Sequence, residues 1–184
     1  MKTELSFAKL AGIETELLAV VAVDTQTSKA PDAKPAPVLL TADEAVKAAA
    51  AAVLASGEFK GGANEAVLLH SPAGLAAKRL LIVGLGKQAK ASVNGVRLAA
   101  GTTVRFSKPR AIRELVFALP ESELLPPGPC SRGSVEGAIL GDFDSDTYRS
   151  DRKDQSVQSF VLAAPSTADK GPVEAAFAEG VIVG

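Results

Sequence analysis

The chain has 184 residues, which suits one domain and is long enough to bury a proper core. Its 20 basic and 21 acidic residues give a formal net charge of −1, which argues against a dedicated surface for nucleic acid or an anionic membrane. The single cysteine, Cys130, excludes a disulfide framework and a cysteine-based zinc site within one chain. No apolar run approaches the roughly 20 residues that span a bilayer, and the start has no signal-peptide core. We therefore expect a cytoplasmic protein with no membrane partner.

The first half of the chain alternates strand and helix patterns. A surface loop with three prolines is expected from Thr25 to Pro37. A helix is expected to start at a capping box of Thr41 and Glu44 and to stop at Gly57. Strands are predicted at Thr3–Phe7, Leu17–Val23 and Glu65–His70.

The stretch Arg79–Gln88 is expected to anchor the fold. Its aliphatic residues run without a polar break into Gly84-Leu85-Gly86-Lys87, which suits a strand buried on both faces and closed by a tight turn. A helical pattern from Ser92 to Ser107 follows. Strand, turn and helix in this order are the building block of an α/β sheet.

The second half continues the alternation. Its last helix, about residues 170–184, has Pro172 at its first position, and its apolar stripe still runs at Gly184 without a cap. We interpret this as a truncation inside a helix. The other predicted elements are a strand at Ile112–Leu119, a rigid loop at Pro126–Pro129, a short helix at Gly133–Leu140 and a strand at Val157–Ala163. Together they predict a three-layer α/β/α domain with a mixed sheet of about six strands and Ala-rich helices on both faces.

The glycines after the anchor strand are the only candidates for a cofactor site. The sequence Gly84-Leu85-Gly86-Lys87-Gln88-Ala89 matches the relaxed dinucleotide pattern G-x-G-x-x-A, but the acid expected about 20 residues later is missing. The phosphate-loop pattern also fails, because Gln88 follows Lys87. A structural turn is the favoured interpretation, with a phosphate or nucleotide held by Gly84, Gly86 and Lys87 as the alternative.

Three further features of the sequence invite a functional interpretation. The stretch from Asp142 begins like a calcium loop, yet Thr147 and Lys153 stand where a glycine and a glutamate are required. His70, the only histidine, is interpreted as a hydrogen-bonded structural residue, and Cys130 as a bystander in a Pro-Gly loop. No catalytic residue and no metal ligand is assigned.

Four segments in a fixed order resemble the N-terminal domain of the leucyl aminopeptidase family, the cytosol aminopeptidases of peptidase family M17. They are Arg79–Lys87, Glu136–Phe143, Thr147–Lys153 and Val173–Gly184. The resemblance implies a small α/β domain, similar to macro domains, that precedes a larger catalytic domain with two divalent metal ions, zinc or manganese. It also implies a hexamer and the release of N-terminal residues, preferentially leucine, by a metal-bridging water.

The residues that would carry this activity do not occur in the chain. The family's metal-binding lysine, aspartates and glutamate, with the segment Asn-Thr-Asp-Ala-Glu-Gly-Arg, are absent from the 184 residues. We therefore expect residues 1–184 to form one non-catalytic N-terminal domain, inactive alone, that supports oligomer architecture, substrate access or regulation. The alternatives are a macro-like module that binds ADP-ribose or a related nucleotide, and a DNA-binding accessory domain.

Overall fold

The computed structural model describes residues 1–28, 33–143 and 156–184. Within these ranges the chain forms a seven-stranded mixed sheet and four α-helices. The strands are β1 (Lys2–Ser6), β2 (Leu17–Asp24), β3 (Pro37–Leu39), β4 (Ala66–His70), β5 (Arg79–Lys87), β6 (Glu114–Ala118) and β7 (Ser159–Ala163). The helices are α1 (Glu44–Ser56), α2 (Val93–Ser107), α3 (Pro127–Asp142) and α4 (Lys170–Val183). In the part described, no helix is long and apolar enough to cross a membrane.

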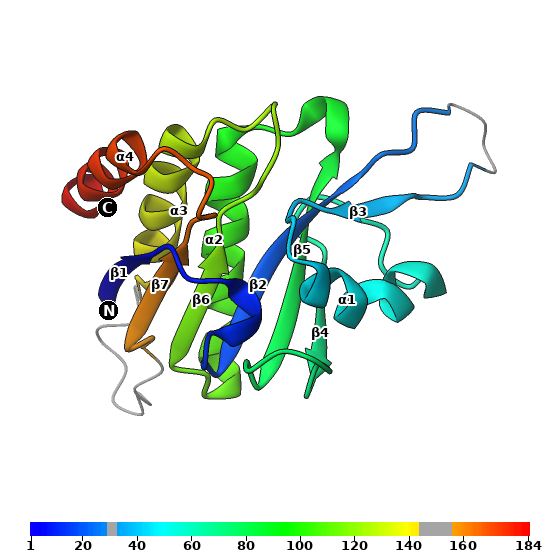
Figure 1. Cartoon of the computed structure of the whole chain (residues 1–184), viewed down its shortest axis with the longest axis horizontal. Helices are drawn as coiled ribbons and strands as arrows, with labels where there is room; N and C mark the ends of the chain where they lie inside the picture. The colour runs from blue at the N-terminus through cyan, green and yellow to red at the C-terminus, as the bar shows by residue number, and fades with distance from the viewer. Residues whose placement is uncertain (29–32, 144–155) are drawn as a thin grey trace.

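The sheet runs in the order β1-β7-β6-β2-β5-β4, with β3 paired to β2 outside this path (Figure 1). Neighbouring strands from β1 to β5 are parallel, whereas β4 pairs antiparallel with β5 and β3 antiparallel with β2. The parallel arrangement places the carboxyl ends of β1, β7 and β6 at the same edge of the sheet, where ligand crevices of such sheets usually form.

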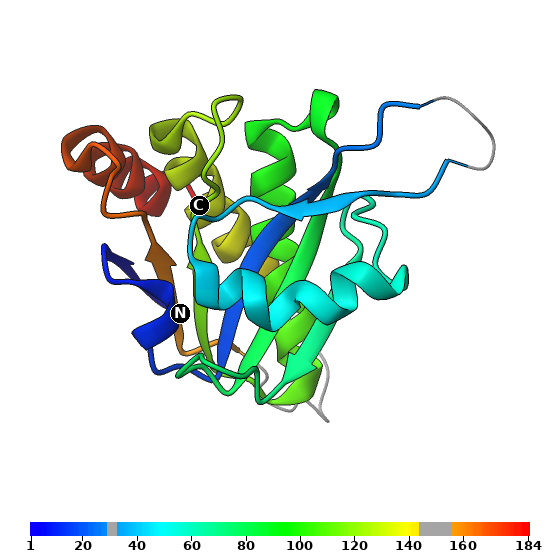
Figure 2. The same ribbon diagram turned by 45° about the vertical axis from the view of Figure 1, so that its right-hand side comes forward.

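The helices form the two outer layers. Helix α1 covers one face, while α2 and α3 cover the other and α4 packs outside α3 (Figures 1 and 2). All eight residues of β2 are buried, and alternate residues serve opposite faces. Leu17, Ala19 and Val21 belong to the core under α2 and α3, and Leu18 and Val20 to the core under α1. The predicted three-layer α/β/α architecture with a mixed sheet is confirmed.

The glycine turn predicted after the anchor strand was wrong. Strand β5 continues through Gly84 and Gly86 as far as Lys87, and the short helical turn Gln88–Lys90 comes only afterwards. The extension forms because the loop at Gly61–Asn64 pairs with this part of β5. Gly86 donates an N–H to the carbonyl oxygen of Gly61 (2.9 Å), and Asn64 donates one to Gly84 (2.8 Å).

Two other predictions need correction. The rigid loop predicted at Pro126–Pro129 is instead the cap and first turn of α3, which also extends beyond the predicted Gly133–Leu140. A proline fits the first helical turn because its missing N–H would have no partner there. The loop predicted from Thr25 to Pro37 ends in strand β3, which is the strand beyond the six expected.

Candidate functional site

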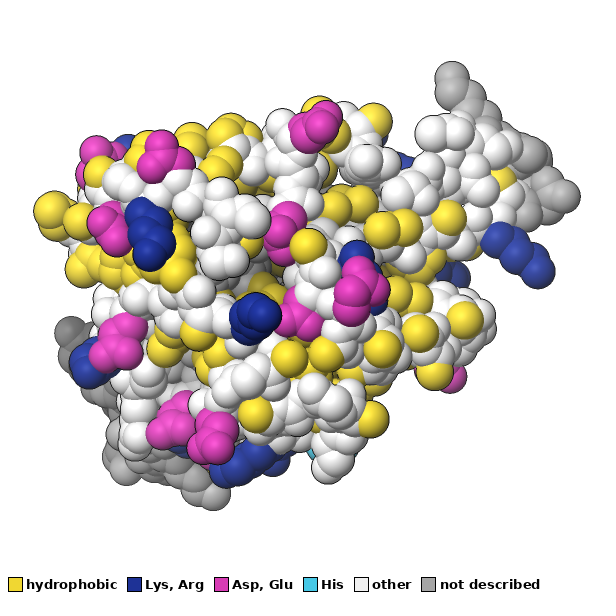
Figure 3. Space-filling view, in the orientation of Figure 1, with side chains coloured by type: hydrophobic (Ala, Val, Ile, Leu, Met, Phe, Trp, Pro, Cys, Tyr) yellow, Lys and Arg dark blue, Asp and Glu magenta, His cyan; other side chains and the backbone are white. Residues whose placement is uncertain are grey.

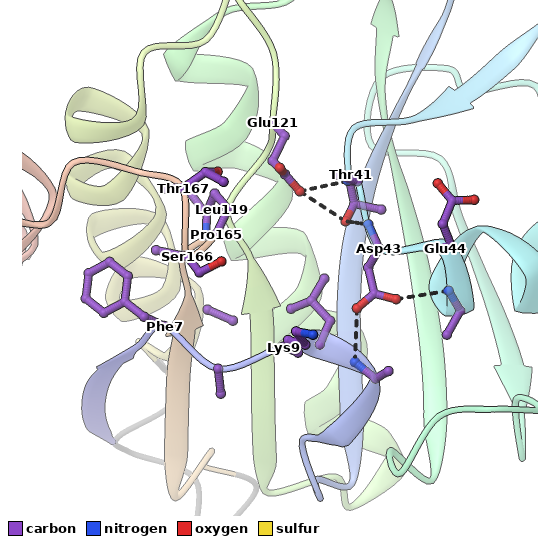
Figure 4. Close-up of a pocket in the computed structure, with 17 residues that line it drawn as sticks. Phe7, Lys9, Thr41, Asp43, Glu44, Leu119, Glu121, Pro165, Ser166 and Thr167 are labelled. Atoms are coloured by element: carbon purple, nitrogen blue, oxygen red, sulfur yellow. Dashed lines mark hydrogen bonds between the residues drawn. The ribbon is translucent and has the colours of Figure 1, made fainter.

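A cleft of about 460 Å³ opens at the carboxyl ends of β1, β6 and β7, beside the start of α1. Figure 4 shows its two sides facing each other, with Phe7 and Ser166 on the β1 and β7 side and Thr41 and Asp43 on the α1 side. The segments that follow β1, β6 and β7 supply the rest of the wall, including Lys9, Glu121 and Thr167. Segments distant in sequence therefore meet at the position where parallel sheets commonly bind ligands.

Asp43 fills the N-terminus of α1. Its Oδ1 accepts N–H groups from Ala45 (3.0 Å) and Val46 (3.2 Å), and its Oδ2 accepts the N–H of Ala11 (3.2 Å). The first N–H groups of a helix have no partner within the helix and can bind an anion, and the Asp43 carboxylate accepts two of them here. The Asp43 carboxylate therefore caps the N-terminus of α1 and, through Ala11, also joins it to the segment after β1.

The capping box predicted from Thr41 and Glu44 was therefore wrong. The Thr41 hydroxyl accepts the N–H of Asp43 (3.2 Å) and lies 3.4 Å from Glu121 Oε1, which it faces as a donor. Glu44 instead pairs with Lys47 at the surface, with 2.8 Å between Oε1 and Nζ. Thr and Asp are both favoured at the N-cap. Because α1 begins at Glu44, the N-cap is Asp43 and not Thr41.

Glu121 forms part of the wall of the cleft on the side of β6. Its Oε1 accepts the N–H of Ala42 (2.7 Å), so this carboxylate crosses from the loop after β6 to the segment before α1 (Figure 4). Asp43, Glu44 and Glu121 outnumber Lys9 among the charged residues that line the cleft. A ligand with several negative charges, such as a diphosphate, would meet unfavourable Coulomb interactions there.

The candidates Gly84, Gly86 and Lys87 do not line this cleft. The N–H of Gly84 donates to the carbonyl oxygen of Glu65 (2.8 Å), as that of Gly86 does to Gly61. The ammonium of Lys87 lies 2.6 Å from Asp24 Oδ2 and 3.0 Å from the carbonyl oxygen of Gln26. Burial opposes the charge on Asp24, but hydrogen bonds from Lys87 and two backbone N–H groups still lower its pKa. These groups thus hold strands and loops together.

The other described residues singled out in the sequence do not line the cleft. His70 is exposed at the end of β4. Cys130 is buried in α3 rather than in a loop, and burial raises the pKa of its thiol to about 11. Of the calcium-like stretch, Asp142 and Phe143 are described, and residues 144–155 lie outside the described residues. Asp142 Oδ1 accepts the N–H of Val157 (3.0 Å).

Sequence reasoning missed the residues that build the cleft. Asp43 could have been found, because it directly precedes the apolar periodicity of α1 as a cap residue does. Glu121 carries no such signal, since it comes beside Thr41 only because β6 and β3 both pair with β2. In the described parts of the chain, no group of three or more His, Cys, Asp or Glu side chains could hold a metal ion.

Comparison with known proteins assigns this fold and sequence to a family. Residues 20–152, most of the chain, match the N-terminal domain of the cytosol aminopeptidase family. The chain belongs to the cytosol aminopeptidase family. A probable cytosol aminopeptidase of Acidobacterium capsulatum is 47% identical over 188 residues, covering 100% of this chain and 37% of that protein. One of Koribacter versatilis is 32% identical, covering 100% of this chain and 38% of that protein.

Solved structures support the same domain fold. A leucine aminopeptidase of tomato matches with a TM-score of 0.70 and 19% identity, over 98% of this chain and 35% of that one. The macro domain of ganglioside induced differentiation associated protein 2 matches with a TM-score of 0.64 and 14% identity, over 95% of this chain and 81% of that one. At such identities the likeness concerns the fold alone. The chain thus spans less than two fifths of the length of the curated aminopeptidase relatives named above.

Proposed function

We propose that this chain is the non-catalytic N-terminal domain of a cytoplasmic, metal-dependent leucyl aminopeptidase that releases N-terminal amino acids, leucine above all, from peptides. The observation that carries the proposal is the match to the family's N-terminal domain, combined with relatives of which the chain covers only 37% and 38%. The names of solved neighbours add support, since one is a leucine aminopeptidase and another is the bottromycin maturation enzyme BotP in complex with Mn.

The residues present do not fit the two divalent metal ions that the family implies. Among the residues described, no cluster of metal-ligating side chains occurs, and the carboxylates of the cleft are used as internal hydrogen-bond acceptors. The ions, the catalytic step and the contacts of a hexamer would therefore belong to the remaining part of the full-length enzyme.

Within that enzyme the domain would act as a rigid accessory unit that supports oligomer architecture, substrate access or regulation. Asp43 and Glu121 support this role, because each carboxylate joins segments far apart in sequence across the cleft. Acidic and basic side chains are interspersed on the face shown in Figure 3, which favours contact with protein over contact with nucleic acid.

The assay of the isolated chain tests the proposal. Purified residues 1–184 are incubated with leucine p-nitroanilide and Mn²⁺ or Zn²⁺, beside the full-length enzyme as the positive control. We expect turnover by the full-length enzyme and none by the isolated chain. Turnover that remains with the isolated chain through repeated purification would refute a non-catalytic role.

A second candidate function is binding of a nucleotide such as ADP-ribose in the cleft. It is favoured by the macro-domain fold and by the position of the cleft, and a macrodomain of Trypanosoma brucei with this fold was solved in complex with ADP. The acidic lining opposes it. Calorimetry of the chain with ADP-ribose decides the point, and the absence of heat at millimolar ligand would remove this candidate.

A further inference from the structure

A pocket of about 400 Å³ lies along the line where α2 and α3 meet. Gly101, Gly137 and Gly141 line it with backbone alone, since a glycine has no side chain to fill the space. None of the residues that line this pocket also lines the cleft at the carboxyl ends of β1, β6 and β7. We call it the arginine pocket, after Arg97 and Arg105 in its wall.

The two arginines are the charged residues among the described residues that line the arginine pocket. The Nε atom of Arg97 is buried without a hydrogen-bond partner in the described part of the chain, and it lies 3.6 Å from Glu136 Oε2. The carboxylate of Glu136 is itself held by Arg132, with 2.7 Å between Oε1 and Nε. Arg105 is exposed and makes no hydrogen bond or ion pair with a described residue. The described wall of the pocket therefore carries two positive charges and no carboxylate.

Helix α2 holds these two charges on either side of a gap. Arg97, Gly101 and Arg105 follow one another at i, i+4 and i+8, so they share one face of the helix and span about 12 Å along its axis. Gly101 leaves the middle of this row without a side chain. A Cβ added there would lie 2.9 Å from the carbonyl oxygen of Gly137, so the packing of α3 keeps the gap open. An anionic group above Gly101 would thus lie between two guanidinium groups.

The rest of the wall combines one amide with two apolar side chains. The hydroxyl of Thr102 donates to Asn64 Oδ1 (3.2 Å), which leaves the amide nitrogen of Asn64 as a further donor. Leu98 is 50% exposed and Leu140 is 46% exposed, and they line the pocket from α2 and α3. Guanidinium groups bind carboxylates through charge-assisted hydrogen bonds, and the leucines offer apolar surface to a hydrocarbon chain beside the carboxylate.

We propose that the arginine pocket binds a small aliphatic carboxylate, with its carboxylate between Arg97 and Arg105 and its hydrocarbon chain against Leu98 and Leu140. The volume of about 400 Å³ suits a small molecule. The two arginines favour an anion over a neutral ligand, and the two leucines favour an aliphatic anion over inorganic phosphate. This inference is independent of the proposed function, because it uses only contacts within the chain.

Nuclear magnetic resonance of the isotope-labelled chain tests the site directly. The probe is isocaproate, a carboxylate with a branched aliphatic chain, and acetate and inorganic phosphate are compared with it at constant ionic strength. We expect saturable shifts of the amide signals of Gly101, Gly137 and Gly141, which line the pocket. We expect isocaproate to bind at least about tenfold more tightly than acetate, because its longer chain buries more apolar surface. Shifts that do not saturate, equal affinity for acetate, or tighter binding of phosphate would each overturn the proposal.

Matched arginine variants test the role of the paired charges. Arg105→Gln removes one charge of the pocket, whereas Arg110→Gln removes the same charge outside it, where the guanidinium lies over the ring of Phe106. We expect Arg105→Gln to weaken isocaproate binding at least about tenfold and Arg110→Gln to change it less than about twofold, because only the first removes a charge-assisted hydrogen bond to the ligand. Unchanged binding in Arg105→Gln, or equal weakening in both variants, would overturn the proposal.

Discussion

At Gly84 a side chain would press against the backbone of the neighbouring loop. A Cβ built there runs into the carbonyl oxygen of Gly62 and lies 2.7 Å from the carbonyl carbon of Gly61. We expect Gly84→Ala to lower the free energy of unfolding by about 1–3 kcal/mol, because loop and strand must move apart. Urea denaturation measures this. Gly12→Ala is the control, since its Cβ meets nothing within 4 Å; an equal loss there would show that close packing is not the cause.

Glu16 links the start of β2 to the start of β6 through its carboxylate. Its Oε2 accepts the N–H of Arg113 (2.6 Å) and that of Glu114 (3.3 Å). The hydrogen bond from Arg113, followed by that from Glu114, lowers the pKa of Glu16, while partial burial opposes the shift. The folded state therefore holds this carboxyl ionised at pH values where the unfolded chain binds a proton.

The stability that Glu16 contributes is present above the ordinary glutamate pKa of about 4.3 and is lost as the pH falls through the lower pKa of the folded state. We expect Glu16→Gln to reduce stability at pH 7 and to make the acid side of the stability curve less steep. Thermal unfolding from pH 7 to pH 3 measures this. The exposed Glu58→Gln serves as control, and an unchanged acid slope in Glu16→Gln would contradict the assignment.

Helices α2 and α3 approach closely along a line of glycines. A Cβ added at Gly101 would lie 2.9 Å from the carbonyl oxygen of Gly137, and one at Gly141 would lie 2.8 Å from that of Gly101. Gly137 itself faces the carbonyl oxygen of Arg97 with no space between for a side chain. The contact of these two elements therefore depends on the absence of side chains.

We expect Gly137→Ala to destabilise the chain by about 1–3 kcal/mol, because the helices must separate. Gly95→Ala, also in a helix, is the matched control, since its nearest neighbour would be 3.6 Å away. There the better helix propensity of alanine is expected to stabilise by about 0.5–1 kcal/mol. Circular dichroism melting curves compare the two, and similar effects of both substitutions would argue against the close contact.

The elements predicted well from the sequence are those with long apolar patterns. Strand β2 and the aliphatic part of β5 lie where they were expected, because strands buried on both faces need continuous apolar residues. Strand β3 has only three residues and begins with a proline, so it carries no periodicity to detect. The start of α3 was predicted as a loop because its prolines and Gly128 suit a loop as well as a first helical turn.

The cleft could not be predicted from local patterns, because strand order alone assembles it. Lys9, Asp43, Glu121 and Thr167 come from four separate parts of the chain. Gly84 and Gly86 were candidates for a phosphate site because they form a continuous sequence motif. In the structure their backbone groups pair β5 with the neighbouring loop. The spacing of residues along the sequence indicates which of them share a face of one helix or strand. It does not indicate which elements come into contact.

For the molecule as a whole, the cleft and a second hollow of about 410 Å³ lie at opposite ends of β1. Phe7 follows the strand at the cleft, whereas Met1 precedes it at the hollow, which Leu140 and Phe143 also line. A group bound in the hollow would therefore leave the cleft open to solvent.

The pairing of β1 with β7 also sets an order of events during synthesis. Lys2 pairs with Ser159 and Ser6 with Ala163, so β1 can find its neighbour only after the segments between β1 and β7 have been made. Contacts so distant in sequence form late, because the closing of long loops precedes any gain from the contact. The central strands can assemble earlier, and β1 has no partner strand until β7 has been made.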